Sequence, residues 1–156
     1  MLTVASIDKF DTINAPKDAA ITIWFSGCKI NCHNCHNPKL QDFKNGKELT
    51  PTELFALILD YMDELKTNSI VLLGGEPLDQ DSEDLHTLCT LLSISGANIH
   101  LYTGYEFEDI YPRLLRTLYW IKTGRYVEEK KVSGKNIASS NQILWNKENG
   151  KWRMMI

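Results

Sequence analysis

The chain has 156 residues and a formal net charge of -3; 43% of its residues are hydrophobic and 24% are charged. This length suits one domain with a sizeable core, and this composition is typical of an ordinary globular protein. The acidic balance excludes nonspecific nucleic-acid binding, which needs a basic surface, and no apolar run approaches membrane-spanning length.

The N-terminal half of the chain predicts one strand and one well-marked helix. Residues 1–20 indicate an irregular approach, with a short extended piece at Thr3–Ile7. The β-branched and aromatic run Ile21–Phe25 predicts the first buried strand. Thr50 and Glu53 then form a capping box around a proline, which predicts a helix with one broad apolar face that ends near Lys66.

The following elements alternate between strands and helices. They are a strand at Ser69–Leu73, a helix from about Asp81 to Ser95, a strand at Asn98–Thr103, helical pieces over Glu106–Leu118 interrupted at Pro112, and a strand at Leu118–Lys122. This order predicts βαβ units and a parallel sheet. Ligands of such sheets bind beyond the carboxyl ends of the strands, and the loops with unusual chemistry all follow those ends.

The tail after residue 126 is polar and spaced by glycines. Its segments Gln142–Trp145 and Lys151–Met154 flank an Asn-Gly pair and predict a hairpin. We therefore expect a single domain over residues 1–156, with a core at about 20–126 and a C-terminal extension at 127–156.

Three cysteines, Cys28, Cys32 and Cys35, follow the first predicted strand at a C-x3-C-x2-C spacing. Three soft thiolates suit an iron–sulfur cluster or a zinc ion, and His33 or His36 can complete a Cys3His zinc site. A four-iron cluster held by three cysteines keeps one iron without a protein ligand. The open position on that iron would make the site chemical rather than structural.

The fourth cysteine differs from the other three. Cys89 lies on the apolar face of a predicted helix, which favours a buried small hydrophobe over a ligand.

The N-terminus has no basic segment followed by an apolar core, so we expect a cytoplasmic protein whose thiols stay reduced. Metal ligation is then favoured over disulfides.

A Gly-Gly-Glu-Pro run at residues 74–77 follows the second predicted strand of the sheet. It can form a mere tight turn. Two glycines also allow a ligand to approach the backbone closely, and Glu76 adds a carboxylate that can accept a hydrogen bond from an ammonium group.

The cysteine spacing and the Gly-Gly-Glu-Pro run resemble the signatures of the radical S-adenosylmethionine (SAM) superfamily. Nearly the whole chain further resembles the anaerobic (class III) ribonucleotide reductase-activating proteins. The matching segments are Asn14–Pro16, Phe25–Cys28, Cys32–Pro38, Gly74–Pro77, Tyr102–Tyr105, Gly124–Tyr126 and Ser139–Gln142. The chain departs from that family at Ala15, where a glycine is common, and at Lys122–Gly124, where many relatives have an Asp-Gly pair.

The resemblance implies a compact, incomplete (open) (β/α) barrel of parallel strands in the α/β class, ending in an irregular or hairpin tail. It implies a [4Fe-4S] cluster on Cys28, Cys32 and Cys35, with SAM bound to the open iron. The positions that it implies for cofactor binding are Asn34, Cys35, His36, Gly74, Gly75, Glu76, Pro77, Thr103 and Tyr105.

The implied activity is that of an activating enzyme. The reduced cluster cleaves SAM, and the resulting 5′-deoxyadenosyl radical takes a hydrogen atom from a backbone glycine of the anaerobic ribonucleotide reductase catalytic subunit. A small electron-donor protein such as flavodoxin is the second implied partner, with no nucleic acid and no membrane. Two alternatives stay open: another small radical SAM enzyme, acting on a different glycyl radical enzyme or making a heterocycle, and a zinc or electron-transfer module.

Overall fold

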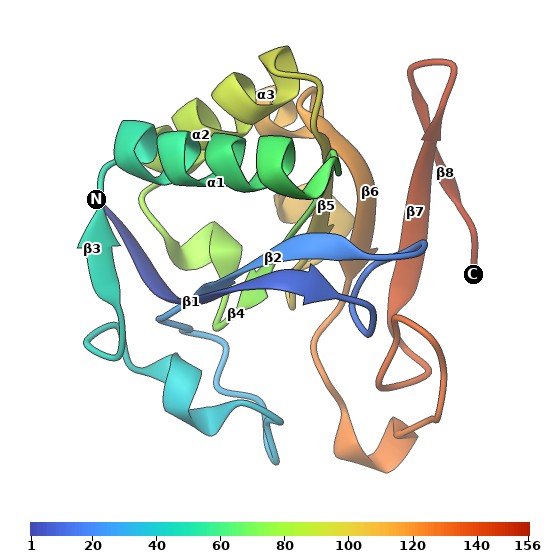
Figure 1. Cartoon of the computed structure of the whole chain (residues 1–156). Helices are drawn as coiled ribbons and strands as arrows, with labels where there is room; N and C mark the ends of the chain where they lie inside the picture. The colour runs from blue at the N-terminus through green and yellow to red at the C-terminus, as the bar shows by residue number, and fades with distance from the viewer.

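The computed structural model describes residues 1–156 and contains one eight-stranded sheet with its α-helices gathered on one face (Figure 1). The strands are β1 Leu2–Asp11, β2 Ala20–Phe25, β3 Lys47–Leu49, β4 Ser69–Gly74, β5 Asn98–Tyr102, β6 Leu118–Thr123, β7 Ile143–Glu148 and β8 Lys151–Met154. The helices are α1 Pro51–Leu65, α2 Ser82–Ile94 and α3 Pro112–Leu115, and the 3-10 turns are η1 Pro38–Gln41, η2 Pro77–Asp79, η3 Phe107–Asp109 and η4 Glu128–Lys130.

The strand order is β3-β1-β2-β4-β5-β6-β7-β8, and the two edge strands do not pair, so the sheet is open. The four central strands β2, β4, β5 and β6 are parallel, as the alternation of strands and helices predicts. Both flanks are antiparallel, since β1 and β3 extend one side and β7 and β8 the other. The parallel strands predicted from the sequence are therefore the centre of the sheet, and the sheet as a whole is mixed.

The N-terminal segment is a second correction. Residues 2–11 form the long strand β1, which pairs with β2 in a register that sets Val4 against Phe25 and Ile7 against Ile23. Only Leu2, Val4 and Asp11 are buried in this strand, and its outer half is mostly exposed, with polar side chains and the exposed Phe10. This half is held as a strand by pairing with the backbone of β2. Its sequence lacks the alternation of buried apolar and exposed polar residues that would have predicted a strand.

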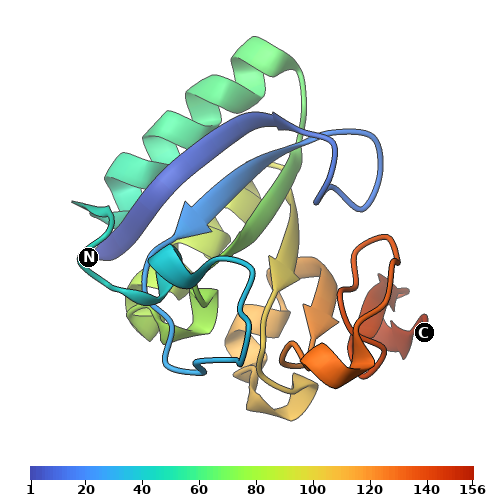
Figure 2. The same ribbon diagram turned by 90° about the horizontal axis from the view of Figure 1, so that it is seen from below.

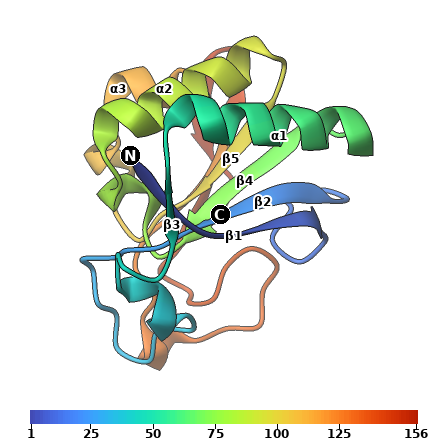
Figure 3. The same cartoon turned by 60° about the vertical axis from the view of Figure 1, so that its left-hand side comes forward.

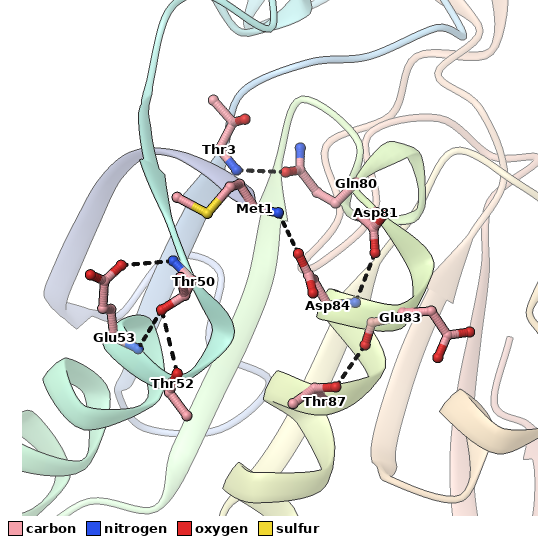
Figure 4. A network of polar contacts seen from close by, with 10 residues as sticks. All are labelled: Met1, Thr3, Thr50, Thr52, Glu53, Gln80, Asp81, Glu83, Asp84 and Thr87. Carbon is pink, nitrogen blue, oxygen red and sulfur yellow. Dashed lines mark hydrogen bonds and ion pairs between the residues drawn. The ribbon is translucent and has the colours of Figure 1, made fainter.

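Helix α1 begins as its capping box predicts. The backbone N–H of Glu53 donates to the Thr50 hydroxyl at 3.2 Å, and the backbone N–H of Thr50 donates to the Glu53 carboxylate at 2.8 Å (Figure 4). The helix ends at Lys66, whose left-handed backbone returns an N–H to the carbonyl of Met62. Helix α2 likewise starts at the predicted aspartate, since Asp81 accepts from the Asp84 N–H at 3.0 Å.

The core is divided by strand β4, which is buried on both faces. Ile70 and Leu72 face helices α1 and α2, where Cys89 is fully buried and its thiol pKa is raised by burial to about 12. Val71 and Leu73 belong to a smaller apolar cluster on the opposite face, with Trp24 and Tyr102 packed against it. The role predicted for Cys89 as a buried hydrophobe is confirmed. The face of the sheet opposite the helices is the one on which the candidate site lies.

The cysteine loop, residues 26–37, and the segment 124–140 lie side by side below the sheet, away from the helices (Figures 2 and 3). Two contacts join them: Arg125 donates from Nη2 to the Ile30 carbonyl at 2.9 Å, and the rings of His36 and Tyr126 have centroids 4.5 Å apart. The loops after the parallel strands thus meet at one edge. None of the helices has the length and apolarity needed to cross a membrane.

Candidate functional site

The cysteine loop presents three free, partly buried thiols within eight residues. Asn31 and Asn34 between them take left-handed backbone angles, with φ of 56° and 54°, a conformation that asparagine tolerates better than most residues. The backbone N–H of Asn37 donates to the Cys35 sulfur at 3.4 Å. No three His, Cys, Asp or Glu side chains stand close enough together in this structure to hold a metal ion.

The two glycines of the Gly-Gly-Glu-Pro run let this loop pack against β2 and the cysteine loop. Gly74 has φ of +120°, and a Cβ there would lie 2.4 Å from the backbone of Phe25. A Cβ on Gly75 would lie 2.5 Å from the carbonyl oxygens of Gly27 and Leu40. The N–H of Glu76 donates to the Gly27 carbonyl at 2.8 Å, so the two loops are joined through their backbones.

Glu76 links the carboxyl ends of β4 and β5. Its Oε1 accepts from the Leu78 N–H at 3.0 Å and from the Thr103 hydroxyl at 2.8 Å, and its Oε2 accepts from the Gly104 N–H at 2.8 Å. Burial raises the pKa of this carboxyl to about 7, although these three donors oppose the rise. A buried carboxyl with a pKa near neutrality is ready to respond to a cation placed beside it.

The raised pKa of Glu76 gives a testable pH dependence of stability. Between the ordinary pKa of 4.5 and about 7, folded Glu76 holds a proton that the unfolded chain has released. Protonated Glu76 therefore adds to the free energy of unfolding. This contribution, about 3 kcal/mol, is fully present below pH 4.5 and is lost as the pH rises through 7. We measure the free energy of unfolding of the metal-free wild type and of Glu76→Gln at pH 4.5 and at pH 8. Between these two pH values, the free energy of the wild type should fall by about 3 kcal/mol more than that of the variant. If the free energy of unfolding had the same pH dependence in both proteins, the raised pKa of Glu76 would be contradicted.

A cavity of about 450 Å³ opens on the helix-free face of the sheet, at the ends of β4, β5 and β6. Its volume suits a ligand the size of a nucleoside derivative. Apolar walls come from Trp24 and Leu73, and Glu76 and Lys122 bring opposite charges to it. The backbone of Gly74 and Gly75 forms part of the same wall, next to the cysteine loop.

Lys122 lines this cavity, and in the sequence it stands out as a departure from the family pattern. Its ammonium group lies 5.1 Å from the centre of the Tyr102 ring, and no carboxylate is within ion-pair distance of it. Burial lowers the pKa of this lysine to about 8, against the attraction of Glu76. The sequence gives one further indication of a role in the site, because Lys122 is a charged residue directly after the apolar run Leu118–Ile121 at the end of a predicted buried strand.

The C-terminal extension closes one side of the cavity. Residues 134–138 line it, and the Asn136 amide donates to the Tyr102 hydroxyl at 2.6 Å. That hydroxyl in turn donates to the Asn14 carbonyl at 2.5 Å, so three segments distant in the sequence meet at one point. The extension is thus part of the wall of the site.

The residues predicted to bind a cofactor do not all face this cavity. Those that line it are His36, Gly74, Gly75, Glu76 and Thr103. Asn34 and Cys35 line a neighbouring surface depression together with Cys32 and His33. Pro77 is buried in the turn η2, and Tyr105 lies outside the cavity with its hydroxyl bound to Asp79 at 2.6 Å.

The donor set and the cavity fit the groups that the sequence implies. Three thiols without disulfide partners, on a loop that follows a central parallel strand, suit an iron–sulfur cluster. The adjoining cavity offers a carboxyl to an ammonium and an unpaired ammonium to a carboxylate. An α-amino acid moiety carries both of these groups, and SAM contains such a moiety.

Residues 18–145 match the family described as the 4Fe-4S single cluster domain, and the chain belongs to this family. The chain is 29% identical to the anaerobic ribonucleoside-triphosphate reductase-activating protein of Enterobacteria phage T4, over 92% of this chain and 93% of that protein. It is 28% identical to the protein of the same name from Escherichia coli K12, over 86% and 92%. It is also 31% identical to the pyruvate formate-lyase-activating enzyme of Clostridium pasteurianum, over 69% of this chain and 47% of that enzyme. The resemblance seen in the sequence is confirmed.

Proposed function

We propose that the protein is a radical SAM activating enzyme that generates a glycyl radical on anaerobic ribonucleoside-triphosphate reductase. The observation that carries this function is the three-cysteine loop beside a cavity with one buried carboxyl and one unpaired ammonium. The likeness to activating proteins of this reductase, over about nine tenths of their length, supports the substrate.

Cys28, Cys32 and Cys35 would hold a [4Fe-4S] cluster, and Glu76 and Lys122 would face the amino and carboxylate groups of SAM. When bound, the cluster and SAM supply the one-electron chemistry that abstracts a hydrogen atom from the partner's glycine. The chain's own residues orient SAM and keep water from it: Trp24 and Leu73 form an apolar wall, and residues 134–138 cover one side.

The open sheet suits a protein substrate. β3 and β8 each have one unpaired edge, and we propose that the sheet forms an incomplete barrel whose open side admits a loop of the reductase. Hydrogen abstraction requires near-contact between the reacting atoms, so such a loop must enter the site. A small cytoplasmic electron donor such as flavodoxin would be the second partner.

The test is to mix the anaerobically reconstituted and reduced protein with SAM and the reductase, and to record the paramagnetic spectrum of the reductase. We expect a glycyl radical and an equal amount of 5′-deoxyadenosine, neither of them with Cys32→Ser. The likeness to a pyruvate formate-lyase-activating enzyme favours a second candidate substrate, so pyruvate formate-lyase is assayed in parallel. A radical on that enzyme alone would replace the reductase as the substrate. SAM cleavage with turnover of a small molecule, and no radical on either protein, would overturn the activating function.

A further inference from the structure

The backbone on both sides of Cys28 is held by two consecutive residues at the end of turn η2. On one side, the Gln80 amide donates to the Ser26 carbonyl at 2.8 Å. On the other side, the Lys29 N–H donates to Asp79 Oδ2 at 2.6 Å. Gln80 is in turn fixed by strand β1, since its Oε1 accepts from the Thr3 N–H at 2.8 Å (Figure 4).

Asp79 is itself held by a residue from another loop. The Tyr105 hydroxyl donates to Asp79 Oδ1 at 2.6 Å, so each carboxylate oxygen of Asp79 has one donor. This hydrogen bond raises the pKa of Tyr105, which keeps the hydroxyl protonated as a donor. The loop after β5 therefore fixes Asp79, and Asp79 fixes the residue that follows Cys28.

The next residue of the cysteine loop is anchored at the same edge. The Ile30 carbonyl accepts from Arg125 Nη2 at 2.9 Å. The Ile30 side chain packs on Gly104, where an added Cβ would come within 2.5 Å of Ile30 Cδ1. The segment that leads from Cys28 toward Cys32 is thus restrained from the ends of β5 and β6, by contacts that involve no cysteine.

We propose that Asp79 is a positioning residue for the cluster, which fixes the backbone beside Cys28 in advance of cluster binding and is aligned by Tyr105. Fixing a ligand before the cluster binds lowers the ordering cost of binding, so the cluster is retained longer. This inference rests on the proposed function because it takes Cys28 as a cluster ligand. It adds a role for Asp79 and gives Tyr105 a function other than SAM contact.

The first measurement uses the metal-free protein and reads the contact itself. Amide hydrogen exchange at Lys29 should accelerate about fivefold to tenfold in Asp79→Ala, because a charge-assisted hydrogen bond is lost at a partly exposed site. Tyr105→Phe should give a smaller increase, since Asp79 remains but is no longer aligned. Glu108→Ala is the matched control, because it removes an exposed carboxylate without a hydrogen-bond partner from the neighbouring turn η3. Thermal unfolding is recorded for each variant, and Asp79→Asn replaces Asp79→Ala if the latter does not fold.

The second measurement reads cluster retention, as the rate at which a chelator removes iron from the reconstituted protein. We expect the rate to rise severalfold in Asp79→Ala, less in Tyr105→Phe, and not in Glu108→Ala. Unchanged Lys29 exchange in Asp79→Ala would overturn the contact. Faster exchange with wild-type iron retention would overturn the positioning role while leaving the proposed function intact. A wild-type protein that takes up no iron would instead refute the proposed function and the positioning role with it.

Discussion

Replacing Cys28, Cys32 or Cys35 singly with serine is expected to abolish the iron–sulfur cluster. A hydroxyl is a far poorer ligand for iron at neutral pH than a thiolate. Each of these thiols lies on the one loop that follows strand β2. The measurement is iron and sulfide content, with the visible spectrum, after anaerobic reconstitution. We expect near-complete loss of the cluster spectrum in each variant, and no SAM cleavage.

Cys89→Ser is the matched control for this series. Cys89 is fully buried between α2 and the sheet, away from the cysteine loop. The added hydroxyl should lower the free energy of unfolding by about 1–3 kcal/mol and leave the iron content unchanged. Loss of iron in Cys89→Ser, or a full cluster in one of the other three variants, would overturn the ligand assignment.

The central part of the fold could be predicted from the sequence because its signals are local. Ile21–Phe25 and Ser69–Leu73 are short runs dominated by β-branched, aromatic and other apolar residues, without the polar alternation of a half-exposed strand, and such runs mark strands buried on both faces. The residues of β4 do face two apolar clusters. The capping box at Thr50 fixed the start of α1 for a similar reason, since its two hydrogen bonds join residues three apart.

Features that depend on distant contacts escaped prediction. The outer half of β1 is largely exposed and carries few buried apolar side chains, and it is a strand because β2 pairs with its backbone. The resemblance places Tyr105 among the cofactor contacts, and nothing in the sequence indicated that its hydroxyl is bound to Asp79, 26 residues away. Lys122 faces the cavity only because three strand ends and the segment 134–138 come together there.

Glu76→Ala is expected to weaken the binding of SAM about tenfold to a hundredfold while leaving the iron content intact. The expected loss corresponds to about 1.5–3 kcal/mol, the contribution of one charge-assisted hydrogen bond from an ammonium group. Glu76 is buried beside the cavity, about 2% exposed, so water can replace little of what the side chain provides. The measurement is a titration of SAM into the reconstituted variant.

A second variant separates the charge of Glu76 from its bracing of the loops, because the same carboxylate also accepts from Leu78, Thr103 and Gly104. Thr103→Val removes one of these donors and keeps the charge. If the charge binds the ammonium group, Thr103→Val should retain most of the affinity for SAM, and the affinity of the wild type should rise with pH as Glu76 ionises near pH 7. Equal losses in Glu76→Ala and Thr103→Val would mean that Glu76 acts by holding β4 to β5. Unchanged affinity in Glu76→Ala would remove it from the SAM site.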